Sequence, residues 1–157
     1  MTGTADSGLQ FYIEATPTVD TAAFATGDLI GAAAIELSGA TGGNEIHGGM
    51  IQSVIVTDLA KQSAALDIVF FDADPSNTTF TENAAFDPDD ADILNIIGVA
   101  AITDWKAFND SSVGQALNLA IPFVADTKNK LYAVIVSRGA PTYGASDVTL
   151  RVGVLAG

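Results

Sequence analysis

The sequence predicts an all-β protein, an antiparallel β-sandwich of jelly-roll type. Short runs of β-branched and aromatic residues recur along the 157-residue chain, separated by turn-forming residues. The chain contains 15 Gly, and 15 Asp against only four Glu; Asp favours turns and helix caps, whereas Glu favours helices. Only one segment has apolar residues at the three- and four-residue spacing of a helix. About eight strands in two packed sheets with long crossings correspond to a jelly roll rather than an up-and-down barrel.

The N-terminal part begins without a packing pattern. Residues 1–8 are small and polar, which predicts a flexible N-terminal arm, and residues 9–157 are predicted to form a single β-sandwich domain. Leu9–Glu14 partly alternates apolar and polar residues and is predicted as the first strand. Asp28–Leu37 is predicted as the second strand, bounded by Gly27 and by a glycine-rich loop.

Two strands are predicted in the middle of the chain. Met50–Val56 alternates and is typical of a strand with two different faces. Ala65–Phe71 is almost continuously apolar, so we expect it at the centre of a sheet with both faces covered. The turn-forming residues after Phe71 end this strand.

One short helix is predicted over about residues 87–97. Asp87 is a suitable cap and Pro88 suits the first helical position. Ile93 and Ile97 lie four residues apart and therefore share a face, and Gly98 is placed to end the helix.

Four further strands complete the prediction. Residues 104–114 are expected to be a long connection, and Pro122 indicates an edge position or a bulge. The predicted strands are Val99–Thr103, Val113–Val124, Leu131–Val136 and Val148–Leu155.

The charge balance disfavours two classes of partner. Six Lys and Arg against 19 Asp and Glu give a net charge of −13 with the single His neutral. The six cations are scattered, so neither a nucleic acid nor an anionic membrane surface is expected as a partner. The longest uncharged stretch, Ser111–Ala125, is too short to span a membrane. The first thirty residues lack the pattern of a secretory signal, so none is expected.

Catalytic, cofactor and metal motifs are not found in the sequence. Cysteine is absent, and the single histidine, His47, lies in a glycine-rich loop without a nucleophile motif nearby. Asp72 and Asp74 begin like a calcium loop, but the required Gly and Glu positions hold other residues. The acidic cluster Asp87, Asp89 and Asp90 is explained by helix capping. The sequence leaves open whether a cation binds at the surface of this cluster or of Asp72 and Asp74. We therefore expect a protein that binds rather than catalyses, with no cofactor.

Three aromatic side chains fall in predicted loops: Trp105, Phe108 and Tyr143. Such residues either plug the end of a sandwich or form a contact patch, since exposed aromatics often anchor interfaces. These three are the candidate interface residues.

Several segments resemble small virion-associated proteins of tailed bacteriophages. The segments are Gly49–Asp58, Ala64–Ser76, Thr78–Phe86, Asp92–Val99 and Leu131–Thr142. The resemblance covers most of the chain from Thr16 to Leu155, and its patterns are those of strands and turns rather than of a catalytic site. It implies a capsid decoration (cement) protein on the outside of the virion, often a trimer, bound to the major capsid protein.

Two other functions remain open from the sequence. The first is a neck, tail or head-fibre component of the virion. The second is a carbohydrate-binding β-sandwich module in which Trp105 and Tyr143 stack on a glycan.

Overall fold

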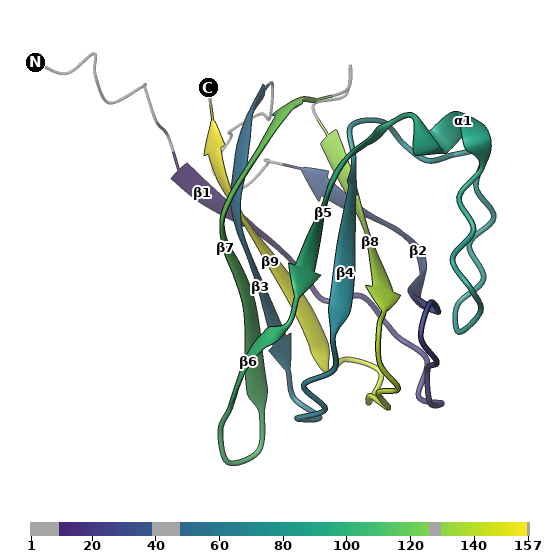
Figure 1. Cartoon of the computed structure of the whole chain (residues 1–157), viewed down its shortest axis with the longest axis vertical. Coiled ribbons are helices and arrows are strands. Elements are labelled where there is room, and N and C mark those ends of the chain that lie inside the picture. Colours follow the sequence, from purple (N-terminus) through teal and green to yellow (C-terminus); the bar gives the residue numbers. More distant parts are fainter. Residues whose placement is uncertain (1–9, 39–47, 126–129, 157) are drawn as a thin grey trace, which may run out of the picture.

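A computed structural model describes residues 10–38, 48–125 and 130–156 (Figure 1). The predicted arm at residues 1–8 and His47 lie outside these ranges. The described residues form nine strands and one helix, α1, between the fourth and fifth strands. They are β1 (Gln10–Ala15), β2 (Leu29–Ser38), β3 (Gly48–Asp58), β4 (Leu66–Phe71), α1 (Asp90–Ile93), β5 (Ile96–Ile102), β6 (Asp104–Ala107), β7 (Ser112–Val124), β8 (Lys130–Ser137) and β9 (Val148–Ala156).

The strands form two antiparallel sheets that face each other. One sheet has the order β1-β9-β3-β7-β6 and the other the order β2-β8-β4-β5. Apart from β6, this is the strand order of an eight-stranded jelly roll, in which the chain crosses repeatedly between the two sheets. The predicted fold class is therefore confirmed, with β6 as a ninth strand.

A single core fills the space between the sheets. Its side chains come from alternate positions of strands in both sheets, as period-2 patterning requires. Ile51 on β3, Phe70 on β4 and Ile135 on β8 are fully buried members of it. These contacts hold the two sheets in a fixed position relative to each other.

A second apolar cluster covers the outer face of the four-stranded sheet. Val69 and Phe71 of β4 alternate with core residues and pack instead with Tyr132 of β8. Phe80 and Phe86, from the long connection between β4 and β5, lie against this cluster with their rings 6.2 Å apart. The prediction that Ala65–Phe71 would have both faces covered is confirmed.

The helix is shorter than predicted. Asp89, not Asp87, is the N-cap, and the helix ends at Ile93 rather than near residue 97. Ile96 already belongs to β5 and lies opposite Phe71 of β4. Because β-branched residues fit a strand well and four helical residues gain little on their own, pairing with β4 ends the helix early.

The connection predicted over residues 104–114 contains a strand. β6 pairs with β7 over only four positions, Asp104 to Ala107, a run too short to give a clear alternation.

Pro122 lies on the part of β7 that has β3 on one side and no described strand on the other, next to an irregularity in the β3–β7 register. The prediction of an edge or bulge there is confirmed. Within the described residues, no helix is long and apolar enough to cross a membrane.

Candidate functional site

Tyr143 packs inside the molecule and is not a contact residue at its surface. Its side chain is 2% exposed, and its ring centroid lies 6.2 Å from that of Phe24. Burial, and secondarily the charge of Asp58, raise the pKa of the Tyr143 hydroxyl well above its usual value. Of the two alternatives left by the sequence, core packing is correct for Tyr143, so stacking of Tyr143 on a glycan is excluded in this structure.

Trp105 and Phe108 lie close in sequence but differ in exposure. The half-buried Trp105 indole of β6 packs directly over Gly114 of β7, where an added Cβ would lie 2.8 Å from the indole Cε2. Phe108 is 58% exposed in the turn between β6 and β7. Of the three predicted aromatic residues, only Phe108 offers most of its ring to a partner, and its role stays a prediction.

The acidic residues serve mainly local structure. Asp89 accepts a hydrogen bond from the backbone N–H of Ala91, and Asp92 is 1% exposed and accepts bonds from Asn77 and Thr78. Among residues 10–38, 48–125 and 130–156, no group of three or more His, Cys, Asp or Glu comes together to hold a metal ion. The clusters Asp72/Asp74 and Asp87/Asp89/Asp90 therefore do not form a ligand set in the part of the chain described.

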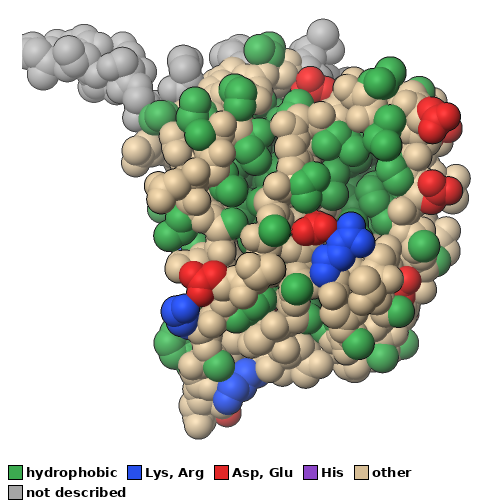
Figure 2. Space-filling view, in the orientation of Figure 1, with side chains coloured by type: hydrophobic (Ala, Val, Ile, Leu, Met, Phe, Trp, Pro, Cys, Tyr) green, Lys and Arg blue, Asp and Glu red, His purple; other side chains and the backbone are tan. Residues whose placement is uncertain are grey.

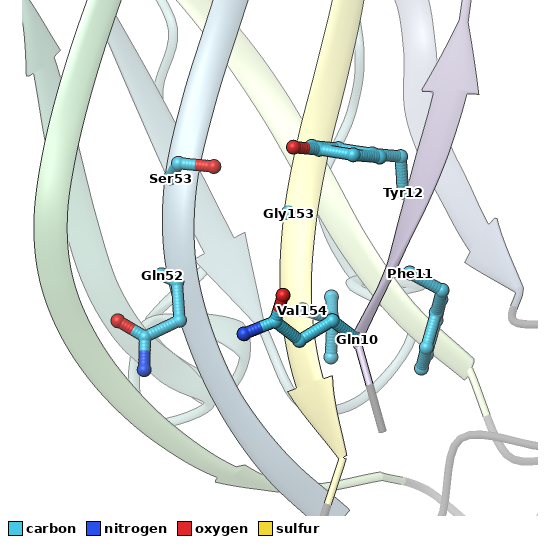
Figure 3. Close-up of a pocket in the computed structure, with 7 residues that line it drawn as sticks. All are labelled: Gln10, Phe11, Tyr12, Gln52, Ser53, Gly153 and Val154. Carbon is cyan, nitrogen blue, oxygen red and sulfur yellow. The ribbon is translucent and has the colours of Figure 1, made fainter. Parts of the chain in front are cut away.

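A depression on the outer face of the five-stranded sheet was not predicted. We call it the Tyr12 pocket; it has a volume of about 260 Å³. Figure 3 shows Tyr12 extending from β1 across β9, with its hydroxyl opposite Ser53 of β3. Gln10 and Gln52 project beside each other, and the backbone of Gly153 lies between these amides and the Tyr12 ring. The lining residues are Gln10, Phe11, Tyr12, Gln52, Ser53, Gly153 and Val154.

Two features of the backbone create this pocket. Tyr12 and Ser53 both lie opposite Gly153 of β9, and a Cβ at that position would collide with the Ser53 hydroxyl. The β3–β9 register shifts between Ile51 and Ser53, which leaves Gln52 as the extra residue of a bulge. A bulge re-aims side chains, and here two consecutive polar residues, Gln52 and Ser53, both line the outer face.

The Tyr12 ring is exposed but held in position. It is 62% exposed, and the Arg151 guanidinium carbon lies 5.7 Å from its ring centroid. Arg151 is in turn paired with Glu14, with 2.9 Å between Nη2 and Oε2. These contacts limit the rotation of a side chain that otherwise faces solvent.

The chain matches no protein-family model and no curated protein.

A second surface, which we call the apolar patch, follows the helix. Three of the exposed large hydrophobic residues fall within seven positions of the chain: Ile93 is 49%, Leu94 84% and Val99 51% exposed. Val99 lies opposite Val69, whose side chain belongs to the outer cluster, so it faces outward from the four-stranded sheet. Figure 2 shows hydrophobic side chains over much of the upper half of the face where α1, β4 and β5 lie. Residues 93–103 include no charged residue.

Both surfaces are suited to binding. The Tyr12 pocket offers amide and hydroxyl groups, and the apolar patch offers area that can be removed from water. Period-2 alternation of Leu9–Glu14 was the sequence signal for the pocket, since it places Tyr12 on the polar face with Gln10 and Glu14 rather than in the core. The bulge at Gln52 left no such signal.

Proposed function

We propose that this protein is a structural component of a bacteriophage virion, a decoration protein that binds the outer surface of the major capsid protein lattice. The proposal starts from the resemblance of its strand and turn segments to small virion-associated phage proteins. A jelly roll with a filled core supports it, because such a domain keeps its shape when it joins an assembly. The protein acts by adhesion and carries out no reaction.

The apolar patch is the observation that carries the proposal. The cores of protein interfaces are depleted in charged residues and rich in apolar ones. Ile93, Leu94 and Val99 are exposed within a stretch, residues 93–103, that has no charged residue. Large apolar side chains that stay exposed within so short a stretch of chain are candidates for a surface that meets another protein.

Binding stabilises the shell by mass action. A ligand that binds the assembled lattice and not the free subunits shifts the equilibrium toward the lattice, in proportion to its concentration and affinity. We propose that the protein is a homotrimer in solution and binds to the exterior of the head in that form. Light scattering of the purified protein tests the oligomeric state separately. A native mass near three times that of one chain is expected.

The decisive experiment measures binding to capsids that lack the protein. Purified protein is added to such capsids of the phage that encodes it, and bound copies per shell are counted after sedimentation. Saturation at many copies per shell, together with higher resistance of the shell to heat, supports the proposal. Occupancy of a single vertex supports a neck, tail or head-fibre component instead, and the absence of binding overturns both.

Two double variants test whether the apolar patch makes the contact. Leu94→Asp with Val99→Asp adds charge to the patch and is expected to lower capsid affinity at least tenfold, about 1.4 kcal/mol or more. Leu59→Asp with Val124→Asp is the matched control, since these side chains are 55% and 76% exposed elsewhere. Equal loss of binding in both variants would contradict the assignment of the patch.

A further inference from the structure

We propose that the Tyr12 pocket binds a neutral pyranose sugar. This inference does not depend on binding to a capsid. The pocket lies on the outer face of the five-stranded sheet, whereas Val99 of the apolar patch faces outward from the four-stranded sheet. The carbohydrate function left open by the sequence is thereby moved from Trp105 and Tyr143 to Tyr12.

The polar groups of the pocket match the hydroxyls of a sugar. Each amide of Gln10 and Gln52 carries two N–H donors and a carbonyl acceptor, and the Ser53 and Tyr12 hydroxyls both donate and accept. A sugar hydroxyl also donates and accepts, so neighbouring ring hydroxyls can bond to one amide on both its atoms. The two amides project beside each other in Figure 3 and can address adjacent hydroxyls of one ring.

The charges exclude other classes of ligand. Among the described residues, those that line the pocket include no Asp, Glu, Lys or Arg, so a metal ion lacks carboxylates there and a phosphate lacks a cation. Arg151, the cation near Tyr12, is paired with Glu14. The net charge of −13 further disfavours an anionic ligand. An uncharged ligand with hydrogen-bonding groups is what remains, and a sugar is such a ligand.

The Tyr12 ring supplies the apolar side of the site. A pyranose has one face of C–H groups, which packs against an exposed aromatic ring and removes both from water. Tyr12 is 62% exposed, and Gly153 has no side chain to come between its ring and the Ser53 hydroxyl. The contact with Arg151 already holds the ring, so less side-chain entropy is lost when a ligand binds.

The size of the pocket selects a small ligand. Its volume of about 260 Å³ lies just below the range of roughly 300–1,000 Å³ found for sites of drug-sized molecules. One sugar ring fills such a space, and further rings of an oligosaccharide would extend over the sheet surface. A single ring of about twelve heavy atoms is expected to bind with Kd of about 1 mM or weaker.

Saturation-transfer NMR with the full chain tests the proposal. The probes are the methyl glycosides of glucose, galactose, mannose and N-acetylglucosamine, with glucuronic acid as the charged counterpart. We expect transfer to the ring C–H protons of at least one neutral glycoside. Absence of transfer for all four, or transfer to glucuronic acid alone, would overturn the inference.

Variants locate the binding. Tyr12→Ala is expected to lower the affinity at least tenfold, Tyr12→Phe to retain the stacking contact, and Gln52→Ala to weaken binding without altering the aromatic ring. Phe108→Ala is the matched control, because Phe108 is 58% exposed against 62% for Tyr12, and it should change affinity less than twofold. Gln52→Ala and Tyr12→Phe keep the test valid if Tyr12→Ala does not fold.

Binding that is unchanged in both Tyr12→Ala and Gln52→Ala would place the sugar elsewhere and refute the assignment. Capsid binding is measured on the Tyr12 and Gln52 variants and should be unchanged, so the two proposals can fail independently.

Discussion

At the scale of single residues, Asp58 is the clearest case of a buried charge that organises its surroundings. It is fully buried at the end of β3, and its carboxylate accepts three backbone N–H groups of the following loop, from Ala60, Gln62 and Ser63, at 2.7–3.0 Å. A carboxylate satisfied by several N–H donors is tolerated in an interior, whereas an unpaired one is not.

We expect Asp58→Ala to lower the free energy of unfolding by about 2–4 kcal/mol, because three buried N–H groups would lose their charged acceptor. Urea unfolding followed by circular dichroism measures the change. The control is Asp74→Asn, since Asp74 is exposed and its loss of charge should change stability by no more than about 0.5 kcal/mol. Equal effects of the two substitutions would show that the loop does not depend on Asp58.

Gly114 gives a second prediction at this scale. A Cβ on this residue would lie 2.6 Å from Ile102 Cγ2 and 2.8 Å from the Trp105 indole, closer than packed atoms allow. Gly114→Ala should therefore destabilise the protein by about 1–3 kcal/mol and blue-shift or broaden the emission of Trp105, the only tryptophan. Gly139→Ala is the milder comparison, because the nearest atom to its Cβ would be the Ala64 methyl, at 3.3 Å. A fully stable Gly114→Ala variant would show that the indole can move aside.

At the scale of elements, the long connection between β4 and β5 is held by hydrogen bonds as well as by its two phenylalanines. Thr78 donates its hydroxyl to Asp92 at 2.7 Å and accepts the backbone N–H of Asp89 at 3.0 Å. Further along, the Leu29 N–H of β2 donates to the Ala84 carbonyl at 2.9 Å. The connection therefore pairs with Leu29, the first residue of β2, and shields this end of the edge strand from pairing with another chain.

Asp92→Asn should loosen this connection while the sandwich stays folded. Asn77 and Thr78 both donate to the Asp92 carboxylate, and an amide offers only one acceptor atom in its place. Hydrogen exchange across residues 75–95 is expected to accelerate on the order of tenfold, with the strands of the five-stranded sheet unchanged. Uniform acceleration over the whole molecule would instead indicate that the connection and the sandwich unfold together.

The order of apolar and polar residues in the sequence identified most of the strands. It missed the features that depend on contacts between residues far apart in the chain. The apolar run at Ala65–Phe71 predicted a strand covered on both faces because its composition differs from an alternating strand. The spacing of Ile93 and Ile97 is typical of a helix, but Ile96 and Ile97 belong to a strand. The pairing of Ile96 with Phe71, which the spacing does not reveal, places them in β5. The pocket beside Tyr12 requires β1, β9 and β3 to be neighbours, which no local pattern contains.

At the scale of the whole molecule, the surface has a surplus of carboxylates that the few cations do not offset. Lys106, Lys130, Arg138 and Arg151 are each within 4 Å of an acidic partner, and Lys61 donates to the carbonyl of Asn109. Because these pairs are largely exposed, each contributes little to stability. The cations of the described residues are thus distributed among local contacts rather than assembled into a basic face.

The stability of the whole molecule should depend on pH below about pH 4. Hydrogen bonds from Asn83, Thr78 and Lys106 hold the pKa values of Asp20, Asp92 and Asp104, respectively, below the usual range. A carboxyl group whose pKa is lower in the folded state stabilises the protein above the pKa of the unfolded state, near 4. That contribution is lost as the pH falls through the folded value. We therefore expect the free energy of unfolding to change little between pH 7 and pH 5 and to decrease below about pH 4.

In urea unfolding at several pH values, the difference in the free energy of unfolding between the wild type and Asp92→Asn should be largest at neutral pH. It should shrink as Asp92 becomes protonated in the wild type, and a difference that is the same at pH 3 and pH 7 would show that the Asp92 charge does not contribute.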